Sequence, residues 1–159
     1  MPSGTGWLTP EEQATWRAFL LVSQLLDEAL DRQLQRDAGM PHAYYGILVR
    51  LSEAPAMTLR MSELAGALRY SQSRMTHAVR SLEGSGWVRR QRSPDDRRGQ
   101  LAMLTDEGRE VLERAAPGHV AEARRQVFDR LSTEQVTELR HICETLLAGL
   151  DAAFPSAAS

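Results

Sequence analysis

The order of short segments between residues 62 and 104 is the feature that most limits how this chain can fold. A short helical pattern over 62–68 is followed by a tight turn, and then by a second helical pattern over 71–83 that Gly84-Ser85-Gly86 ends. Two short strand patterns then flank a loop of turn-forming and charged residues at 93–99. This order of helix, tight turn, helix and β-hairpin predicts a winged helix-turn-helix.

Longer helical patterns precede this region. Thr9 is placed to cap a helix, and a proline and two acidic residues follow it at the positive end of the helix dipole. Apolar residues recur at helical spacing as far as Asp37, and Gly39 ends the pattern. Pro41 opens a second helix, which closes before Pro55.

Two more helices follow the hairpin. Thr105 is placed to cap the fifth helix, which Pro117-Gly118 should kink or interrupt. Ser132 or Thr133 caps a sixth helix that carries apolar residues at helical spacing towards Phe154. The sequence therefore predicts one structural unit over 1–159, mainly α, with six helices and a small β-hairpin wing.

The formal charge is divided unevenly along the chain. The net charge of the whole chain is −2, but residues 69–98 contain eight arginines and only three acidic residues, a formal charge of +5. The remaining residues therefore carry −7. A basic segment within an acidic chain indicates a localised binding face for a negatively charged partner such as nucleic acid.

The helix expected over 71–83 has two different sides when its residues are placed at intervals of about 100°. One side is apolar, and the opposite side has hydroxyl, amide, imidazole and guanidinium groups but no glutamate. Such groups can reach base edges and phosphates in a major groove, although a plain solvated face is the alternative interpretation. The apolar side consists of Met75, Ala78, Val79 and Leu82, and the polar side of Gln72, Ser73, Thr76, His77 and Arg80.

The hairpin, with strands expected at 87–92 and 100–104, makes the DNA-binding interpretation stronger. Five arginines fall within ten residues of it, and two aspartates lie near its tip. A charged loop is usually only solvated, but a hairpin that directly follows a reading helix can place its tip in the adjacent minor groove, which attracts arginine. Asp96 is placed to orient Arg98 by a local ion pair.

Five segments of the chain carry a resemblance to a known family: Met61–Ala65, Ser71–Leu82, Leu82–Arg90, Asp95–Gly99 and Leu104–Gly108. The most specific part is the Asp-Arg-Arg tip followed by Leu-Thr-x-x-Gly. These segments resemble the MarR family (multiple antibiotic resistance regulators), and the similarity extends over nearly the whole chain.

This resemblance implies that residues 41–104 bind double-stranded DNA and that residues 8–38 and 105–154 build an intertwined homodimer. Arg98, braced by Asp96, would enter the minor groove, and Arg97 would contact phosphate. The DNA-contacting residues expected on these grounds are Ser71, Gln72, Ser73, Arg74, Thr76, His77, Arg80, Arg90, Asp96, Arg97 and Arg98.

Members of the family often change their DNA affinity when a small phenolic or lipophilic ligand binds between the dimer helices and the reading domain. Trp16, His42, Tyr44 and Tyr45 are candidates to line such a pocket, and for each the alternative is a core or interface residue. The chain departs from the family here, because Pro41-His42 stands where many relatives begin the second helix with threonine.

The remaining residues favour no catalytic, metal or redox chemistry. Glu138-x-x-His141 has the spacing of one half of a di-iron site, but the second half is missing from the sequence. The single cysteine, Cys143, lies on an apolar stripe and is expected to be a buried structural thiol, with a redox sensor as the less favoured alternative. We therefore expect no catalytic residues, no cofactor and no metal.

The sequence predicts a cytoplasmic protein without a membrane partner, because residues 1–10 lack a signal-peptide pattern and the longest apolar run is 18–22. It predicts a bacterial, sequence-specific transcription regulator, a ligand-responsive repressor that binds a pseudo-palindrome as a homodimer. The alternative is an architectural DNA-binding protein with no sequence preference and no ligand.

Overall fold

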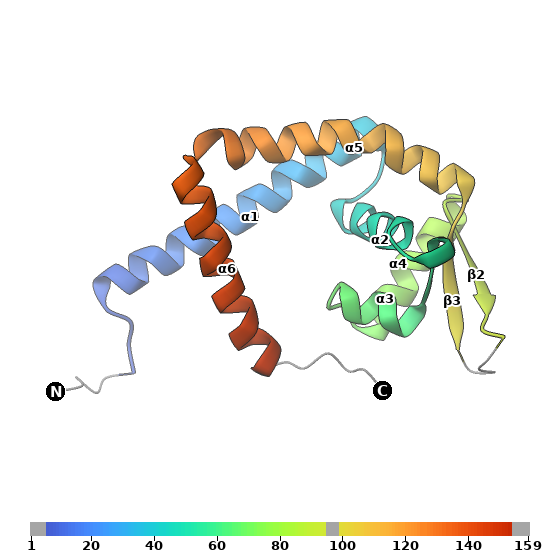
Figure 1. Cartoon of the computed structure of the whole chain (residues 1–159), viewed down its shortest axis with the longest axis horizontal. Helices are drawn as coiled ribbons and strands as arrows, with labels where there is room; N and C mark the ends of the chain where they lie inside the picture. Colours follow the sequence, from blue (N-terminus) through green and yellow to red (C-terminus); the bar gives the residue numbers. More distant parts are fainter. Residues whose placement is uncertain (1–5, 95–98, 154–159) are drawn as a thin grey trace.

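The computed structural model describes residues 6–94 and 99–153 (Figure 1). Within them, a compact part of short helices and a small sheet is joined to three long helices. In chain order the elements are α1 (Pro10–Ala38), α2 (His42–Ser52), the 3₁₀ helix η1 (Pro55–Met57), β1 (Thr58–Arg60), α3 (Met61–Ala67), α4 (Gln72–Gly84), β2 (Val88–Arg92), β3 (Gln100–Leu104), α5 (Asp106–Gln126), the 3₁₀ helix η2 (Phe128–Arg130) and α6 (Thr133–Ala153).

The compact part contains α2, α3, α4 and a three-stranded antiparallel sheet of order β1-β3-β2. The predicted hairpin is confirmed, with Arg90 of β2 opposite Ala102 of β3. The sequence pattern predicts only these two strands and assigns none to residues 57–60, whereas Leu59 of β1 pairs with Ala102 from the other side. Three residues are too few to show a period of two, so β1 is defined by its pairing with β3.

A single core holds the compact part together and extends to the end of α1. Side chains from α2, α3 and α4 are buried in it, and Leu34 and Met40 join it from the end of α1 and the residues that follow it. The largest of the fully buried side chains are Leu34, Met40, Ile47, Leu48, Leu51, Leu64, Met75, Val79 and Leu82.

The helix boundaries follow the predicted capping residues. Thr9 accepts a hydrogen bond from the backbone of Glu12 at 3.2 Å, and the Glu12 carboxylate accepts one from the backbone of Thr9 at 2.7 Å. Gly39 ends α1 in a left-handed conformation with φ +64°. Ser132 accepts from the backbone of Gln135, so it is Ser132 that caps α6.

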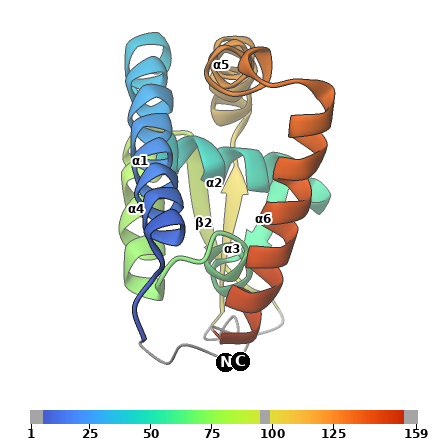
Figure 2. The same ribbon diagram turned by 90° about the vertical axis from the view of Figure 1, so that its left-hand side faces the viewer.

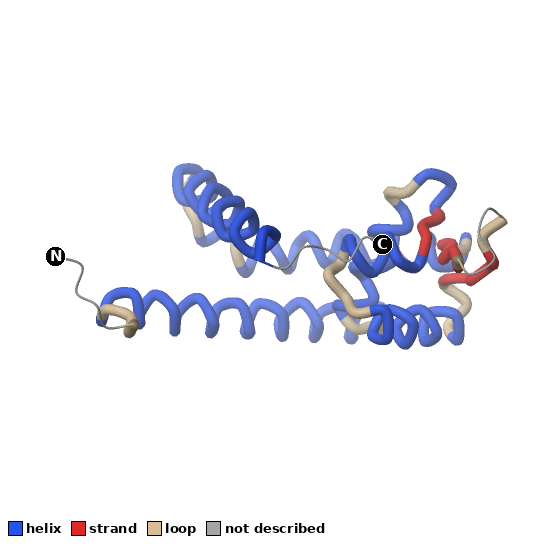
Figure 3. Tube along the Cα trace, turned by 90° about the horizontal axis from the view of Figure 1, so that it is seen from below, coloured by secondary structure: helices blue, strands red, loops and turns tan. Residues whose placement is uncertain are grey.

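The long helices α1 and α5 pack against each other, and Figure 3 shows α1 as one uninterrupted helix. The sequence predicts a kink or an interruption of the fifth helix at Pro117-Gly118, and the interruption is wrong, because α5 continues from Asp106 to Gln126. Proline removes only one backbone hydrogen bond from a helix, and the packing along α1 holds the remainder in place. A Cβ atom at Gly118 would lie 3.0 Å from Gln33 and Asp37 side-chain atoms, so glycine permits this close approach.

The turn between α4 and β2 is tied to the start of α5 by the Leu104–Gly108 segment. The Thr105 hydroxyl donates to the carbonyl oxygen of Gly86 at 2.7 Å and accepts from the amide of Gly108 at 3.0 Å. A Cβ atom at Gly108 would lie only 2.1 Å from the carbonyl oxygen of Trp87. Glycine is therefore required at 108 because backbone occupies the space that a side chain would need.

Three rings meet where α1, α2 and α5 join. The rings of Tyr45 and His119 lie 4.3 Å apart between centroids, and those of His42 and His119 lie 5.4 Å apart. His42 Nδ1 contacts the Asp27 carboxylate at 2.8 Å, and the His42 amide donates to Asp31 at 2.8 Å. We call this group of His42, Tyr45, His119 and Asp27 the joint cluster.

Burial lowers the pKa of His119, and the charge of His42 lowers it further. The Nδ1 atom of His119 is buried and has no hydrogen-bond partner among the described residues. The folded state therefore favours the neutral imidazole at this position. Burial also raises the pKa of the Tyr45 hydroxyl, which stays neutral.

Helix α6 lies apart from α1, as Figure 2 shows, and is exposed along its length. From Thr133 to Asp151 every residue except Val136 is exposed. The prediction that Cys143 is buried is wrong for the single chain, where the residue is exposed because no described element of the same chain covers this side of α6. In the part of the chain that the structure describes, no helix combines the length and apolar character needed to cross a membrane.

We expect Gly108→Ala to lower the free energy of unfolding by about 1–3 kcal/mol, because the new methyl group must displace the Trp87 backbone. Urea unfolding at neutral pH measures this. Gly84→Ala is the control, since no atom lies within 4 Å of a Cβ at that position. An equal loss of stability in both variants would contradict the steric explanation.

The free energy of unfolding should also depend on pH through His119. Because its folded-state pKa lies below the ordinary value of 6.5, its contribution is complete above pH 6.5 and is lost as the pH falls through the lower pKa of the folded state. We expect His119→Gln to lose less stability than the unsubstituted protein between about pH 7.5 and about pH 5 in urea unfolding. His141→Gln, at an exposed histidine, is the control, and equal pH dependence in all three proteins would contradict the role of His119.

Candidate nucleic-acid interface

A tight turn between α3 and α4 sets the position of α4. The amide of Tyr70 donates to the carbonyl of Ala65 at 2.9 Å, and that of Arg69 to Gly66 at 3.2 Å, which ends α3. Arg69 adopts a left-handed conformation with φ +54°, which reverses the chain direction over a short turn. The Ser71 hydroxyl then accepts from the amide of Arg74 at 3.2 Å and begins α4.

The two sides of α4 are those that the sequence predicts. Met75, Ala78, Val79 and Leu82 are buried in the core of the compact part. The opposite side projects outwards, with Thr76 half-buried. The exposed residues of this side and of the first turn are Gln72, Ser73, Arg74, His77 and Arg80.

The first turn of α4 carries an ordered arginine. The Arg74 guanidinium lies over the ring of Tyr70, 3.9 Å from its centroid, in a cation–π contact. This contact restricts Arg74 beside the N-terminus of α4, where backbone amides favour a phosphate group. Ser71 is exposed, and its hydroxyl oxygen serves the cap.

The sheet supports the wing beside α4. Its two long strands are joined beyond β2 by a hydrogen bond of 2.9 Å from the amide of Ser93 to the carbonyl of Gly99. At the tip of the wing, the family resemblance assigns Arg98 to the minor groove, Asp96 to bracing it and Arg97 to phosphate, and all three lie outside the described residues. Figure 1 shows that α3, α4 and the wing belong to the same end of the molecule.

Arg90 does not project freely from the wing. Its Nε and Nη2 atoms each lie 2.6 Å from Oε2 of Glu83, and its backbone amide donates to Oε1 of Glu83 at 2.9 Å. Sequence reasoning did not single out Glu83, because it lies near the end of a helix and its partner lies in a strand. No periodic pattern connects positions across such a boundary.

The four candidate ligand-pocket residues are only partly brought together. His42 and Tyr45 meet in the joint cluster, and His119 completes it, which sequence reasoning missed because 119 is remote in the chain. Tyr44 is half-buried against the core. Trp16 is 51% exposed on α1 and stacks on Phe19, about 16 Å along the helix from Asp27.

An open pocket of about 320 Å³ lies elsewhere, between α2, β1 and α3, and contains none of those four residues. It is lined by Arg50, Glu53, Ala54, Leu59, Glu63 and Ala67. In the described parts of the chain, no group of three or more histidine, cysteine, aspartate or glutamate side chains could hold a metal ion.

The chain is similar in sequence to known regulators. The model of the MarR family matches residues 41–99. The HTH-type transcriptional regulator PecS of Dickeya dadantii is 33% identical over 120 residues, which cover 75% of this chain and 71% of PecS. The transcriptional repressor MprA of Escherichia coli K12 is 30% identical over 131 residues, which cover 82% of this chain and 73% of MprA.

A solved structure is more similar still. Sco3205, a MarR family transcriptional regulator from Streptomyces coelicolor crystallised in complex with DNA, is 56% identical and superposes with a TM-score of 0.89. The match covers 91% of this chain and 94% of Sco3205. The chain therefore belongs to the MarR family of transcriptional regulators.

Proposed function

We propose that this protein binds double-stranded DNA with sequence specificity as a homodimer and represses transcription. The observation that carries the proposal is α4, which buries its apolar side and presents short polar side chains and arginine outwards. The DNA complex of Sco3205 and the name of the repressor MprA support it by similarity. Residues 41–104 form the DNA-binding region in this proposal.

The outward polar side of α4 is assigned to the major groove. Gln72, Ser73, Thr76, His77 and Arg80 read base edges, where amide, hydroxyl and guanidinium groups distinguish base pairs. The first turn, with Ser71 and the Arg74 guanidinium ordered by Tyr70, contacts the phosphate backbone.

The wing is assigned to the adjacent minor groove. Arg98 enters the groove, braced by Asp96, and Arg97 contacts phosphate. A narrow minor groove has an enhanced negative potential that favours an inserted guanidinium.

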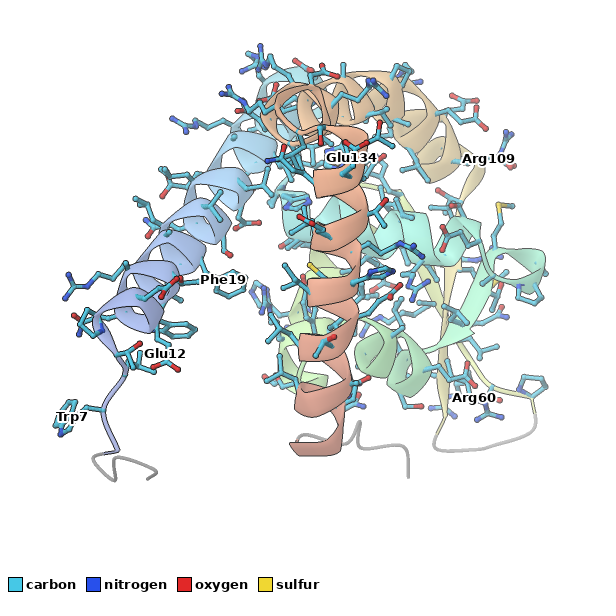
Figure 4. The ribbon with its side chains drawn as sticks, turned by 60° about the vertical axis from the view of Figure 1, so that its left-hand side comes forward. Trp7, Glu12, Phe19, Arg60, Arg109 and Glu134 are labelled. Carbon is cyan, nitrogen blue, oxygen red and sulfur yellow. The ribbon has the colours of Figure 1, made fainter. Side chains whose placement is uncertain are left out.

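Two regions, 8–38 and 105–154, are assigned to dimerisation. Large apolar side chains on α1 and α6 are exposed in the single chain, and an extended exposed apolar surface usually marks an interaction site. Figure 4 shows Phe19 projecting from α1 on the side that faces α6, and Phe19 is 46% exposed. The exposed apolar residues of the two helices are Trp16, Phe19, Leu20, Leu21, Val22, Leu25, Leu139, Ile142, Leu146, Leu147 and Leu150.

The effector is assigned to the region of the joint cluster. A small aromatic or lipophilic molecule that binds beside His42, Tyr44 and Tyr45 would change how α2 and the DNA-binding region sit against α1 and α5. Within one chain Trp16 lies far from Asp27 along α1. It therefore belongs to the effector region only if the dimer brings it closer to the joint cluster.

Selection of random duplex DNA on the purified protein, near physiological salt, tests the function. We expect enrichment of an inverted repeat whose half-sites lie about one helical turn apart. The Arg80→Ala variant should lose preference at particular base pairs, at a cost of about 1–3 kcal/mol for each. Binding without enrichment would instead favour an architectural protein, and a uniform loss in Arg80→Ala would make Arg80 a phosphate contact.

Light scattering tests the dimer. We expect a dimer at micromolar concentration and dissociation in Ile142→Glu, because a carboxylate on the apolar side of α6 would be buried in the interface. Ala148→Glu places the same side chain on the opposite side of α6 and should remain dimeric. A monomeric unsubstituted protein, or equal behaviour of the two variants, would contradict the assignment of α6.

A further inference from the structure

The contact between Glu83 and Arg90 joins the two elements that the proposed function places in different grooves of DNA. Glu83 lies in the last turn of α4, three residues after Arg80, and Arg90 lies at the centre of β2. Their side chains are each 26% exposed, so the pair is largely removed from solvent. An ion pair in this position is screened less by salt than one on an open surface.

The Glu83 carboxylate binds both the side chain and the backbone amide of Arg90. Oε2 of Glu83 receives two guanidinium nitrogens at 2.6 Å, and Oε1 receives the backbone amide of Arg90 at 2.9 Å. Backbone hydrogen bonds join residue 87 to 105 and residue 93 to 99, so by the alternation of an antiparallel pair the amide of Arg90 points away from β3. Because β2 is the edge of the sheet, this amide has no partner on another strand. One carboxylate therefore satisfies an edge amide and fixes the strand against α4.

Arg92 is the natural comparison for Arg90. Side chains alternate along a strand, so Val88, Arg90 and Arg92 lie on the same side of β2, and Val88 is buried. Arg92 lies about 7 Å closer to the tip, is exposed, and makes no ion pair within residues 6–94 and 99–153. In the described part of the chain no carboxylate engages its guanidinium, whereas Glu83 engages that of Arg90.

We propose that Glu83 and Arg90 are positioning residues that hold the wing at a set angle to α4, and that Arg92, rather than Arg90, is the phosphate contact of this strand. The proposal rests on the DNA-binding function proposed above. It replaces the assignment of Arg90 as a DNA contact. It also gives an acidic residue next to the DNA a favourable role in binding.

Two substitutions separate this proposal from a direct role of Arg90. If Arg90 contacts phosphate, Glu83→Gln removes a nearby negative charge and should tighten DNA binding. If the pair positions the wing, Glu83→Gln should weaken binding about three- to tenfold. Arg90→Lys keeps the positive charge but not the two-nitrogen geometry, so it should weaken binding similarly, and the double variant should bind no more weakly than either single one.

Salt dependence separates Arg90 from Arg92. Arg92→Gln should reduce the slope of log K against log salt concentration by about 0.9 for each phosphate that the arginine neutralises. Arg90→Lys should leave the slope close to that of the unsubstituted protein while its affinity falls. Glu110→Gln on α5 makes the same charge change as Glu83→Gln at a site away from the pair, so it controls for the effect of net charge in Glu83→Gln.

The affinities are measured by fluorescence anisotropy on the inverted repeat selected as described above, well below the melting temperature of each variant. Tighter or unchanged binding by Glu83→Gln, or unchanged binding by Arg90→Lys, would overturn the positioning role alone. An unchanged slope in Arg92→Gln would overturn the assignment of Arg92. Absence of DNA binding by the unsubstituted protein would overturn the proposed function and this proposal with it.

Discussion

The burial of one side of α4 is the constraint on which the rest of the structure depends. Met75, Ala78, Val79 and Leu82 pack into the core, and this packing fixes the rotation of α4 about its own axis. The polar side must then face outwards. A helix of 13 residues would be marginally stable alone in water, so the tertiary packing both forms α4 and aims it.

Contacts at both ends of α4 fix its position relative to the neighbouring elements. The left-handed Arg69 and the Ser71 cap fix where the helix begins. At its other end, Glu83 holds β2, and Thr105 and Gly108 hold the start of α5 against the turn. The wing and α5 are therefore both anchored at the C-terminal end of α4.

The long helices α1 and α6 differ from α4, because the single chain does not cover their apolar sides. Phe19, Leu146 and Leu150 are among the large apolar side chains exposed on these helices, and an extended exposed apolar surface usually marks an interaction site. Helix α5 belongs to both parts, since it packs against α1 and α2 and carries His119 into the joint cluster. The joint cluster thus lies where the long helices α1 and α5 meet α2 of the compact part.

Local sequence patterns determined most of the helices and strands of this protein. Capping residues such as Thr9, Ser71 and Thr105, together with the apolar periodicity of each helix, act over a few residues and were therefore predictable, as were the polar side of α4 and the hairpin strands. Tertiary structure alone decided β1, the continuity of α5 through Pro117, the exposure of Cys143 and the meeting of His42 with His119. It also decided that Arg90 faces Glu83, because a contact between a helix and a strand depends on packing that no local pattern encodes.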